Sequence, residues 1–144
     1  MSLMNIAYVP APVVSPKDSV RAAVNAALPE NCDAAAVVEN GRIVGILTSR
    51  DVMLKVVLRR LDPEQVKVGE VMTHPVVKLH PNTPAEEALG LMLANNFRHL
   101  PLTEDGAKVC GLLSMRRVMA HILEDQRENL HQMESFLNAD GVGG

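Results

Sequence analysis

The chain repeats part of its own sequence, and this duplication limits its fold more than any other feature. Residues 16–41 align with residues 81–106 without a gap, and residues 45–57 align with residues 111–123 after one inserted residue. The first copy reads Glu-Asn-Gly where the second reads Glu-Asp-Gly-Ala, so the inserted residue falls between two predicted strands. A hairpin loop at this place tolerates such an insertion. The duplication is therefore structural. Identical pairs are Pro16 and Pro81, Ala23 and Ala88, Leu28 and Leu93, Asn31 and Asn96, Glu39 and Glu104, and Gly41 and Gly106.

The first copy predicts the order strand, helix, strand, strand, helix. Asp18 is expected to cap the first helix. The core face of this helix is predicted to carry Val20, Ala23, Val24, Ala27 and Leu28. Ala34–Val38 and Arg42–Leu47 are predicted to form a hairpin across Asn40-Gly41, a dipeptide typical of tight turns. A second helix, beginning at Ser49, closes the unit.

The second copy predicts the same order. Val76–Leu79 is expected to be a short strand, and Thr83–Glu86 a capping box with Pro84 at the first helical position. Apolar residues then follow at helical spacing, namely Ala85, Ala88, Leu89 and Met92. Leu100–Thr103 and Lys108–Leu113 are predicted to form the second hairpin, which a closing helix follows.

A single unit is below the size at which a hydrophobic core is usually stable alone, so the two units are expected to pack together. The predicted class is α+β (α/β), with two tandem β-α-β-β-α repeats. Glu70–Met72 is expected to be a short helical turn. The predicted segments are an N-terminal segment at 1–10, which could include non-native residues, repeat 1 at 11–60, a connector at 61–70, repeat 2 at 71–123, a C-terminal helix extension at 124–137 and a flexible tail at 138–144.

Composition excludes several classes of function. The 144 residues have a net charge of -3, which leaves no excess of positive charge to attract nucleic acid or an anionic membrane. Aromatic residues make up 2% of the chain, so stacking platforms for single-stranded nucleic acid are not expected. Cys32 and Cys110 have no metal-site spacing and indicate free thiols in a reducing, cytoplasmic compartment. No apolar run approaches the length of a membrane span.

A polar junction follows the second hairpin strand of the first copy, in the run Gly45-Ile-Leu-Thr48-Ser-Arg-Asp51. A helix beginning at Ser49 presents free backbone N–H groups to an anion, and the Thr48 hydroxyl can donate a hydrogen bond to phosphate. Asp51 can accept both hydroxyl groups of a ribose. The same spacing also fits a plain helix cap that needs no ligand. Its recurrence at Gly111-Leu-Leu-Ser114 favours a binding site.

Taken together, these motifs resemble a tandem pair of CBS domains, the Bateman module. The resemblance rests on the two Gly-h-h-[ST] junctions, on Val-Met-Thr-x-Pro-Val-Val from Val71 and on Arg-His-Leu-Pro-Leu from Arg98. It implies a pseudo-twofold disc whose central clefts bind AMP, ADP, ATP or S-adenosylmethionine as an effector, with no cofactor. Modules of this family act as energy or metabolite sensors.

The resemblance implies a main cleft in which Asp51 binds ribose. In such pairs the start of one repeat packs near the junction of the other, which places Thr73 there. Family members with a basic residue at the position of Arg98 or His99 use it against phosphates, whereas a surface Arg and an ordinary His are the alternative. The expected set is Thr48, Ser49, Arg50, Asp51, Thr73, Val76, Val77, Arg98, His99, Leu100 and Pro101.

A second cleft is expected to differ from the first. Its expected residues are Val13, Val14, Ala34, Ala35, Ser114, Arg116 and Arg117. Arg117 stands where the family motif has the ribose-binding Asp. We therefore expect one nucleoside per chain, and at Arg117 a bare anion or a polyphosphate tail at most, with a solvent-facing Arg117 as the alternative.

The closing helices carry more apolar surface than one face can bury, which predicts a twofold homodimer. The predicted interface residues are Val52, Met53, Val56, Val57, Val118, Met119, Ile122 and Leu123. Farther along, the seven-residue spacing of Leu123, Leu130 and Leu137 allows a short coiled coil or a partner-docking seam. A helix lying on its own domain is the favoured interpretation.

Enzyme motifs are absent from the sequence. The five histidines form no HExxH or His-x-His pattern, and no Gly-x-Ser-x-Gly elbow occurs, so neither a metal site nor a catalytic triad is expected. The sequence predicts a non-enzymatic regulatory module for signal transduction, which binds an adenosine-containing ligand and reports its occupancy to an unidentified protein. The alternatives are a ligand-free dimerisation or interaction module and a regulatory fragment of a larger enzyme or transporter.

Overall fold

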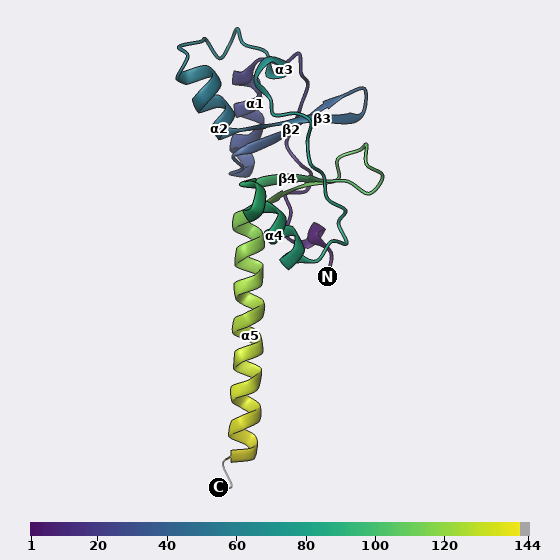
Figure 1. Ribbon diagram of the computed structural model, residues 1–144, viewed down its shortest axis with the longest axis vertical. Helices are drawn as coiled ribbons and strands as arrows, with labels where there is room; N and C mark the ends of the chain where they lie inside the picture. The colour runs from purple at the N-terminus through teal and green to yellow at the C-terminus, as the bar shows by residue number, and fades with distance from the viewer. Residues whose placement is uncertain (142–144) are drawn as a thin grey trace.

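The computed structural model describes the backbone of residues 1–141 and the side chains of residues 1–138. Two small α+β repeats lie one above the other, and a single long helix projects from the second repeat (Figure 1). This arrangement confirms the predicted class. In chain order the elements are η1 (Leu3–Asn5), β1 (Val13–Val14), α1 (Val20–Ala27), η2 (Leu28–Glu30), β2 (Ala34–Glu39), β3 (Arg42–Thr48), α2 (Ser49–Val52), η3 (Met53–Val57), α3 (Val68–Val71), α4 (Ala85–Asn95), β4 (His99–Leu102), β5 (Gly111–Ser114) and α5 (Met115–Gly141).

The first repeat forms a three-stranded sheet in the order β1-β2-β3, with β1 parallel and β3 antiparallel to β2. The predicted hairpin is confirmed, because Asn40 and Gly41 both have positive φ, as a tight type I′ turn requires. The predicted cap of α1 was wrong. Ser19, not Asp18, accepts the hydrogen bond from the Ala22 N–H, because Asp18 is already engaged by the Ser15 N–H.

The second repeat has a shorter sheet, the antiparallel pair β4-β5. The strand predicted at Val76–Leu79 is reduced to one bridge between Leu79 and Leu102. The capping box predicted at Thr83 was also wrong. Pro84 has an extended backbone, with ψ at 143°, and is itself the N-cap residue of α4, so Thr83 lies one position too far from the helix to cap it.

The hairpin loop with the inserted residue is held by an acidic side chain. The Asp105 carboxylate accepts hydrogen bonds from the Lys108 and Ala107 N–H groups, and these bonds lower its pKa to about 2. The insertion therefore lies in an exposed, internally bonded loop, as the comparison of the two copies predicted. The second strand starts at Gly111, three residues later than predicted at Lys108, because this loop takes up the intervening chain.

Each repeat is completed by the segment that precedes the other. Leu3, from the segment expected to lie outside the repeats, is fully buried in the core of the second repeat. Tyr8 forms a bridge with Leu112 of β5. In the same way, α3 packs Val68 and Val71 into the core of the first repeat. The exchange makes the two repeats one folding unit.

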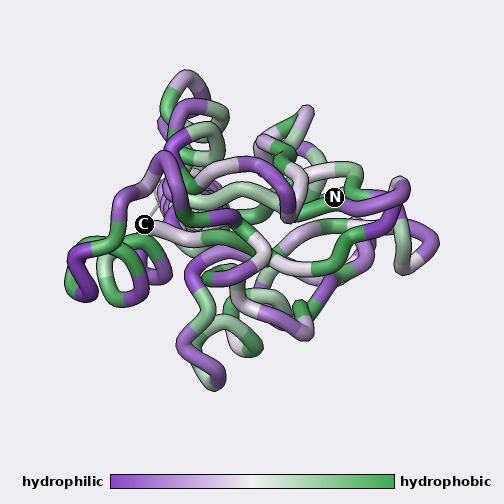
Figure 2. Tube along the Cα trace, turned by 90° about the horizontal axis from the view of Figure 1, so that it is seen from above, coloured by the Kyte–Doolittle hydropathy of each residue, from purple (hydrophilic) through white to green (hydrophobic). Residues whose placement is uncertain are grey.

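A small apolar cluster lies where the two repeats meet, formed by Cys32, Ala34, Ile46 and Leu112. In the view along the long axis, hydrophobic stretches run through the middle of the body and hydrophilic ones occupy many of the outer turns (Figure 2). Ile46 and Leu112 are equivalent positions of the duplicated sequence. The cluster between the repeats therefore includes equivalent positions of β3 and β5.

The C-terminal helix does not lie on its own domain, so the favoured prediction for it was wrong. The side chains of residues 123–138 are all exposed, and α5 leaves the body as a straight rod (Figure 1). The helix continues to Gly141, beyond the predicted start of a flexible tail at residue 138, and residues 142–144 lie outside the described chain. Within residues 1–141, no helix is long and apolar enough to cross a membrane.

Candidate functional site

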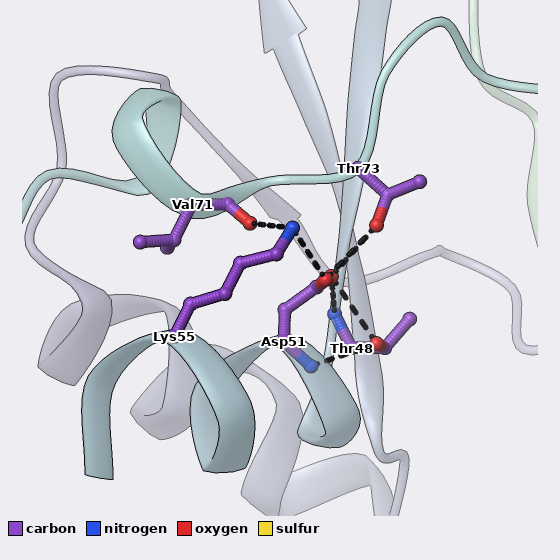
Figure 3. Close-up of polar contacts among 5 residues, drawn as sticks. All are labelled: Thr48, Asp51, Lys55, Val71 and Thr73. Carbon is purple, nitrogen blue, oxygen red and sulfur yellow. Dashed lines mark hydrogen bonds and ion pairs between the residues drawn. The ribbon is translucent and has the colours of Figure 1, made fainter. Parts of the chain in front are cut away.

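The Thr48–Asp51 junction joins β3 to α2 (Figure 3). Thr48 is the N-cap residue, and its hydroxyl accepts a hydrogen bond from the Asp51 N–H at 3.3 Å. The Asp51 carboxylate accepts one in return from the Thr48 N–H at 3.1 Å. The predicted helix start at Ser49 is confirmed. Both hydrogen bonds of a helix capping box are therefore present, as the alternative without a ligand expects. Asp51 has further partners in addition.

The Asp51 carboxylate is the most enclosed charge of the junction, with 6% of the residue exposed. Besides the Thr48 N–H it accepts hydrogen bonds from the Thr48 and Thr73 hydroxyls, the latter at 2.9 Å, and its Oδ1 lies 3.0 Å from Lys55 Nζ. Four donors match the roughly four lone-pair positions of a carboxylate. A buried charge is tolerated where it is paired in this way. A hydroxyl from outside must therefore replace one of these donors.

Thr73 and Lys55 reach Asp51 from different parts of the chain. Thr73 forms a bridge with Ile46, which brings the start of the second repeat to the junction of the first, as predicted. Lys55, which the sequence analysis missed, also donates to the Val71 carbonyl at 2.9 Å. The sequence does indicate this contact, because Lys55 follows Asp51 by four residues and such a spacing places two side chains on one helix face.

The pairing of the strands places the remaining cleft residues differently from the prediction. His99 lies opposite Ser114, whereas Ala34 lies opposite Thr48. The Arg98-His99 pair therefore belongs beside the second junction and Ala34 beside the first, the reverse of the expected grouping. The reason is that each hairpin pairs within its own repeat.

The other residues expected at the main cleft have different surroundings. Leu100 lies in the core of the second repeat, Pro101 is buried, and Val76 packs on the central cluster. Ser49, Arg50 and Val77 are exposed.

The pKa of His99 is affected by charges from both repeats. Burial lowers its pKa below the ordinary value, the Asp33 charge raises it, and the Arg98 charge lowers it again. Asp33 precedes Ala34 of the first repeat, so an acidic group of one repeat and an imidazole of the other lie close to the shared interface.

The second junction has a different chemistry. Ser114 accepts a hydrogen bond from the Arg117 N–H at 3.1 Å, as a serine cap does. The Arg117 guanidinium lies over the ring of Tyr8, 3.6 Å from its centroid, and the Tyr8 hydroxyl donates to the Asn31 carbonyl at 3.3 Å. Arg117 is exposed, as the solvent-facing alternative expected, and the aromatic face beneath its guanidinium also favours a cation in the helix's first turn.

The other residues expected at the second cleft lie in different surroundings. Val14 and Ala35 are buried in the core of the first repeat and do not contribute there, because β1 and β2 turn these side chains inward. Val13 pairs with Ala36 in the sheet, and Arg116 is exposed. Ala34 pairs with Thr48 of the first junction and also belongs to the central cluster that contains Leu112 of the second repeat.

The closing helices expose about half of their predicted interface. Val56 and Val118 are fully buried in their own repeats, and Val52 and Ile122 pack against those same cores. Helical periodicity turns the others outward, and these are Met53, Val57, Met119 and Leu123. A pocket of about 270 Å³ opens beside Met53 between α1 and α2, and its lining includes Thr48 and Ser49 of the first junction.

Two further features limit the chemistry of the site. Cys32 is buried and Cys110 partly buried, both as free thiols, and burial raises the pKa of each. Among the residues that the structure describes, no group of three His, Cys, Asp or Glu side chains is arranged to hold a metal ion.

The exchange of segments and the paired polar junctions define a two-repeat α+β module with unequal junctions. The CBS domain family model matches this chain twice, at residues 3–58 and 68–124. The chain therefore belongs to the CBS domain family and carries two CBS domains in tandem. Both matches begin in the exchanged segments, at residues 3 and 68, in agreement with their burial in the fold.

Similar proteins cover most of this chain. CBS domain-containing protein CBSX3, mitochondrial, from Arabidopsis thaliana is 29% identical over 125 residues, which are 83% of this chain and 60% of that protein. The crystal structure of the CBS domain NE2398 is 32% identical, with a TM-score of 0.74, covering 80% of this chain and 89% of that one. The chain spans smaller shares, 41% and 20%, of two other curated relatives.

A more distant structure shares the fold. It is the CBS domain pair of protein MJ0100, described in complex with 5-methylthioadenosine and S-adenosyl-L-methionine, with a TM-score of 0.77 and 21% identity over 87% of this chain and 98% of that one.

Proposed function

We propose that this chain is a regulatory module that binds an adenosine-containing ligand, AMP, ADP, ATP or S-adenosylmethionine, at the Thr48–Asp51 junction. The observation that carries the proposal is Asp51, a buried carboxylate at the position where the CBS motif has its ribose-binding acid. The ligands named for the MJ0100 pair, which contain adenosine, support the same class.

Ribose binds by exchange of hydrogen bonds. The Thr73 hydroxyl and the Lys55 ammonium are the donors that can leave Asp51, because Thr48 is fixed by the helix cap. Two ribose hydroxyls replace them without leaving the carboxylate unsatisfied. The ammonium of Lys55, once released, can pair with a phosphate. The aliphatic side chain of Val76, on the central cluster, is available to the adenine.

The same exchange provides a signal. Thr73 lies on the segment that leads into the second repeat, so its bond to Asp51 ties the two repeats together. A ligand that replaces Thr73 favours a state in which this tie is open. Occupancy then shifts the equilibrium between two arrangements of the repeats, which a partner protein can distinguish.

Binding of this kind has a direct test. Calorimetric titration of the full chain with AMP, ATP and S-adenosylmethionine should give one nucleoside site per chain. If all three fail to bind at millimolar concentration, the ligand-free interaction module is correct. The specific observation in its favour is that every lone-pair position of Asp51 already has a donor.

We also propose a homodimer through the exposed part of the closing helices. Met53 and Val57 are 59% and 66% exposed, and their equivalents Met119 and Leu123 are 44% and 63% exposed, so both repeats present an apolar surface. In a dimer with twofold symmetry, the apolar surface of one copy would be buried against the same surface of the other. A sedimentation experiment at micromolar concentration that found only the 15.6 kDa species would contradict it.

The two free cysteines suit a reducing compartment such as the cytoplasm.

The third alternative is a regulatory part of a larger enzyme or transporter. A piece of a larger enzyme or transporter would use the same junction, since the chain spans 60% or less of its first curated relatives. The proposal therefore concerns the ligand and its coupling to the two repeats, and the full reading frame would identify any further domain.

A further inference from the structure

The outer part of α5 has an apolar side that nothing in the described chain covers. From Leu123 to Asn138 every side chain is exposed, over more than four turns of helix. This stretch belongs to the part of α5 that projects from the body in Figure 1. Isolated helices of this length are marginally stable in water, and most helices in proteins are stabilised by packing of an apolar face. Residues 123–138 are described as helical, so a packing partner for this segment would explain their conformation.

The apolar residues of this segment follow a heptad pattern. Leu123, Leu130 and Leu137 are seven residues apart and define the position called a. Met133 falls at position d, with Gln126 as the polar member of that row. Leu130 and Met133 are 57% and 62% exposed, so this row is available to a partner. An a/d row of this kind is the seam of a two-stranded coiled coil.

The charges beside the seam distinguish between two orientations of a second helix. At the e positions, Arg127 and Glu134 have opposite charges, whereas at the g positions Ile122, Asn129 and Phe136 are uncharged. In a parallel pair e faces g of the partner, which joins no opposite charges. In an antiparallel pair e faces e, so Arg127 of each helix meets Glu134 of the other. Two ion pairs form, one on each side of the twofold axis.

The acidic residues on the outer face agree with this orientation. Glu124, Asp125 and Glu128 all lie in the half of the segment nearer the body. A parallel pair would hold these carboxylates at the same level of the two helices, whereas an antiparallel pair places them at opposite ends, where their repulsion is smaller. A pair with one twofold axis is closed, so it does not grow into filaments.

We propose that residues 123–137 of α5 pair with the same segment of a second copy as an antiparallel coiled coil. In this arrangement Leu130 of one copy packs against Met133 of the other, near the twofold axis. The seam is about two heptads long, so the association is weak and depends on concentration. It shares only Leu123 with the apolar surface proposed for the closing helices, it is separate from the Thr48–Asp51 junction, and it does not depend on the proposed ligand.

Disulfide trapping tests both the pairing and its direction. Two variants, Leu130→Cys and Met133→Cys, are oxidised separately and as an equimolar mixture, with the unaltered chain as the control for Cys32 and Cys110. The antiparallel pair predicts several-fold more covalent dimer in the mixture than in either variant alone. Trapping in Leu130→Cys alone at the level of the mixture would mean a parallel pair, and trapping in none of the samples would mean that α5 does not self-associate. Either result overturns the proposal.

Charge exchange gives a second measurement that keeps the apolar seam intact. Arg127→Glu places two acids at the e positions, and Glu134→Arg places two bases there, so each variant should lose one association step in sedimentation. Mixing the two variants should restore it, because every e pair is then opposite in charge. Glu128→Arg makes the same change on the outer face and should leave the association within about twofold of the unaltered chain. Failure of the mixture to recover overturns the antiparallel arrangement.

Discussion

The two strand-to-helix junctions occupy equivalent positions of the duplicated sequence and carry opposite charges. In the first, Asp51 is a buried anion that receives donors from Thr48, Thr73 and Lys55. In the second, Arg117 takes the position of Asp51 and lies against the ring of Tyr8. Tyr8 and Thr73 are themselves equivalent, because they bridge to the equivalent strand residues Leu112 and Ile46.

This comparison shows how a duplicated scaffold acquires unequal sites. The capping hydroxyl is kept in both copies, as Thr48 and Ser114, because the helix needs it in either case. The residue three positions later completes the capping box in the first copy, as Asp51, but the second helix begins with Arg117 there, so this position can change its charge. Its partner from the other repeat changes with it, from a hydroxyl that donates to a carboxylate to an aromatic ring that receives a cation. Ribose chemistry is therefore expected at the first junction only.

The largest effect is expected for Asp51→Ala. It removes the proposed ribose acceptor and leaves Lys55 and Thr73 without their shared partner. The free energy of unfolding should fall by about 2 to 3 kcal/mol, below the full value of a buried pair because Lys55 is partly exposed. Nucleotide affinity should fall by about 1.5 to 3 kcal/mol. Denaturant unfolding and calorimetry measure the two effects separately.

The matched control for that variant is Arg117→Ala, at the equivalent position of the second repeat. It should lower stability by less than about 1.5 kcal/mol and leave nucleotide affinity unchanged, since its partner is an aromatic face. If Arg117→Ala reduced nucleotide binding as much as Asp51→Ala, the two junctions would be equivalent in function and the comparison would fail.

Tyr8→Ala should come next in size. It removes the ring under Arg117 and a residue packed on the central cluster, for an expected loss of about 1 to 2 kcal/mol in stability. Tyr8→Phe keeps the ring and loses only the hydrogen bond to the Asn31 carbonyl, with an expected cost of about 0.5 to 1 kcal/mol. Equal losses in thermal unfolding of the two variants would show that the ring face contributes nothing.

Much of this difference could be predicted from the sequence, and the reason is local. The junctions follow from Gly-h-h-[ST] spacing, and the contrast of Asp51 with Arg117 is visible by aligning the two copies. The hairpin at Asn40-Gly41 was equally local, because positive φ at both residues is a property of that dipeptide.

What the sequence could not provide were contacts that join distant segments. The burial of Leu3 in the second repeat, and the meeting of Tyr8 with Arg117, depend on the exchange of segments between repeats. The placement of His99 beside Ser114 depends on strand register, which single-residue patterns do not determine. The exposure of α5 likewise depends on where the body ends in space.

Thr73→Val tests the exchange of donors at the first junction. The valine keeps the shape of the side chain and removes the hydroxyl that donates to Asp51 at 2.9 Å, so stability should fall by about 1 kcal/mol. Nucleotide affinity should rise by a few-fold, because the ribose no longer competes with this hydroxyl. A fall in affinity, measured by calorimetry against the unaltered chain, would mean that Thr73 assists the ligand and does not compete with it.

The smallest expected effect concerns pH and His99, which stands opposite Ser114 where the first repeat has Ala34 opposite Thr48. Burial lowers the pKa of His99 in the folded protein, so the unfolded chain binds the proton more readily. The contribution of neutral His99 is complete above its ordinary pKa of about 6.5, and stability falls as the pH drops from there toward the lower folded pKa. His99→Gln should flatten the dependence of unfolding free energy on pH across this range, by less than about 1 kcal/mol, since Asp33 opposes the effect of burial. The control is Ala34→Gln, which adds an amide at the equivalent position of the first repeat and should leave the slope with pH unchanged. A slope that survives His99→Gln would place the titrating group elsewhere and remove His99 from the comparison of the two junctions.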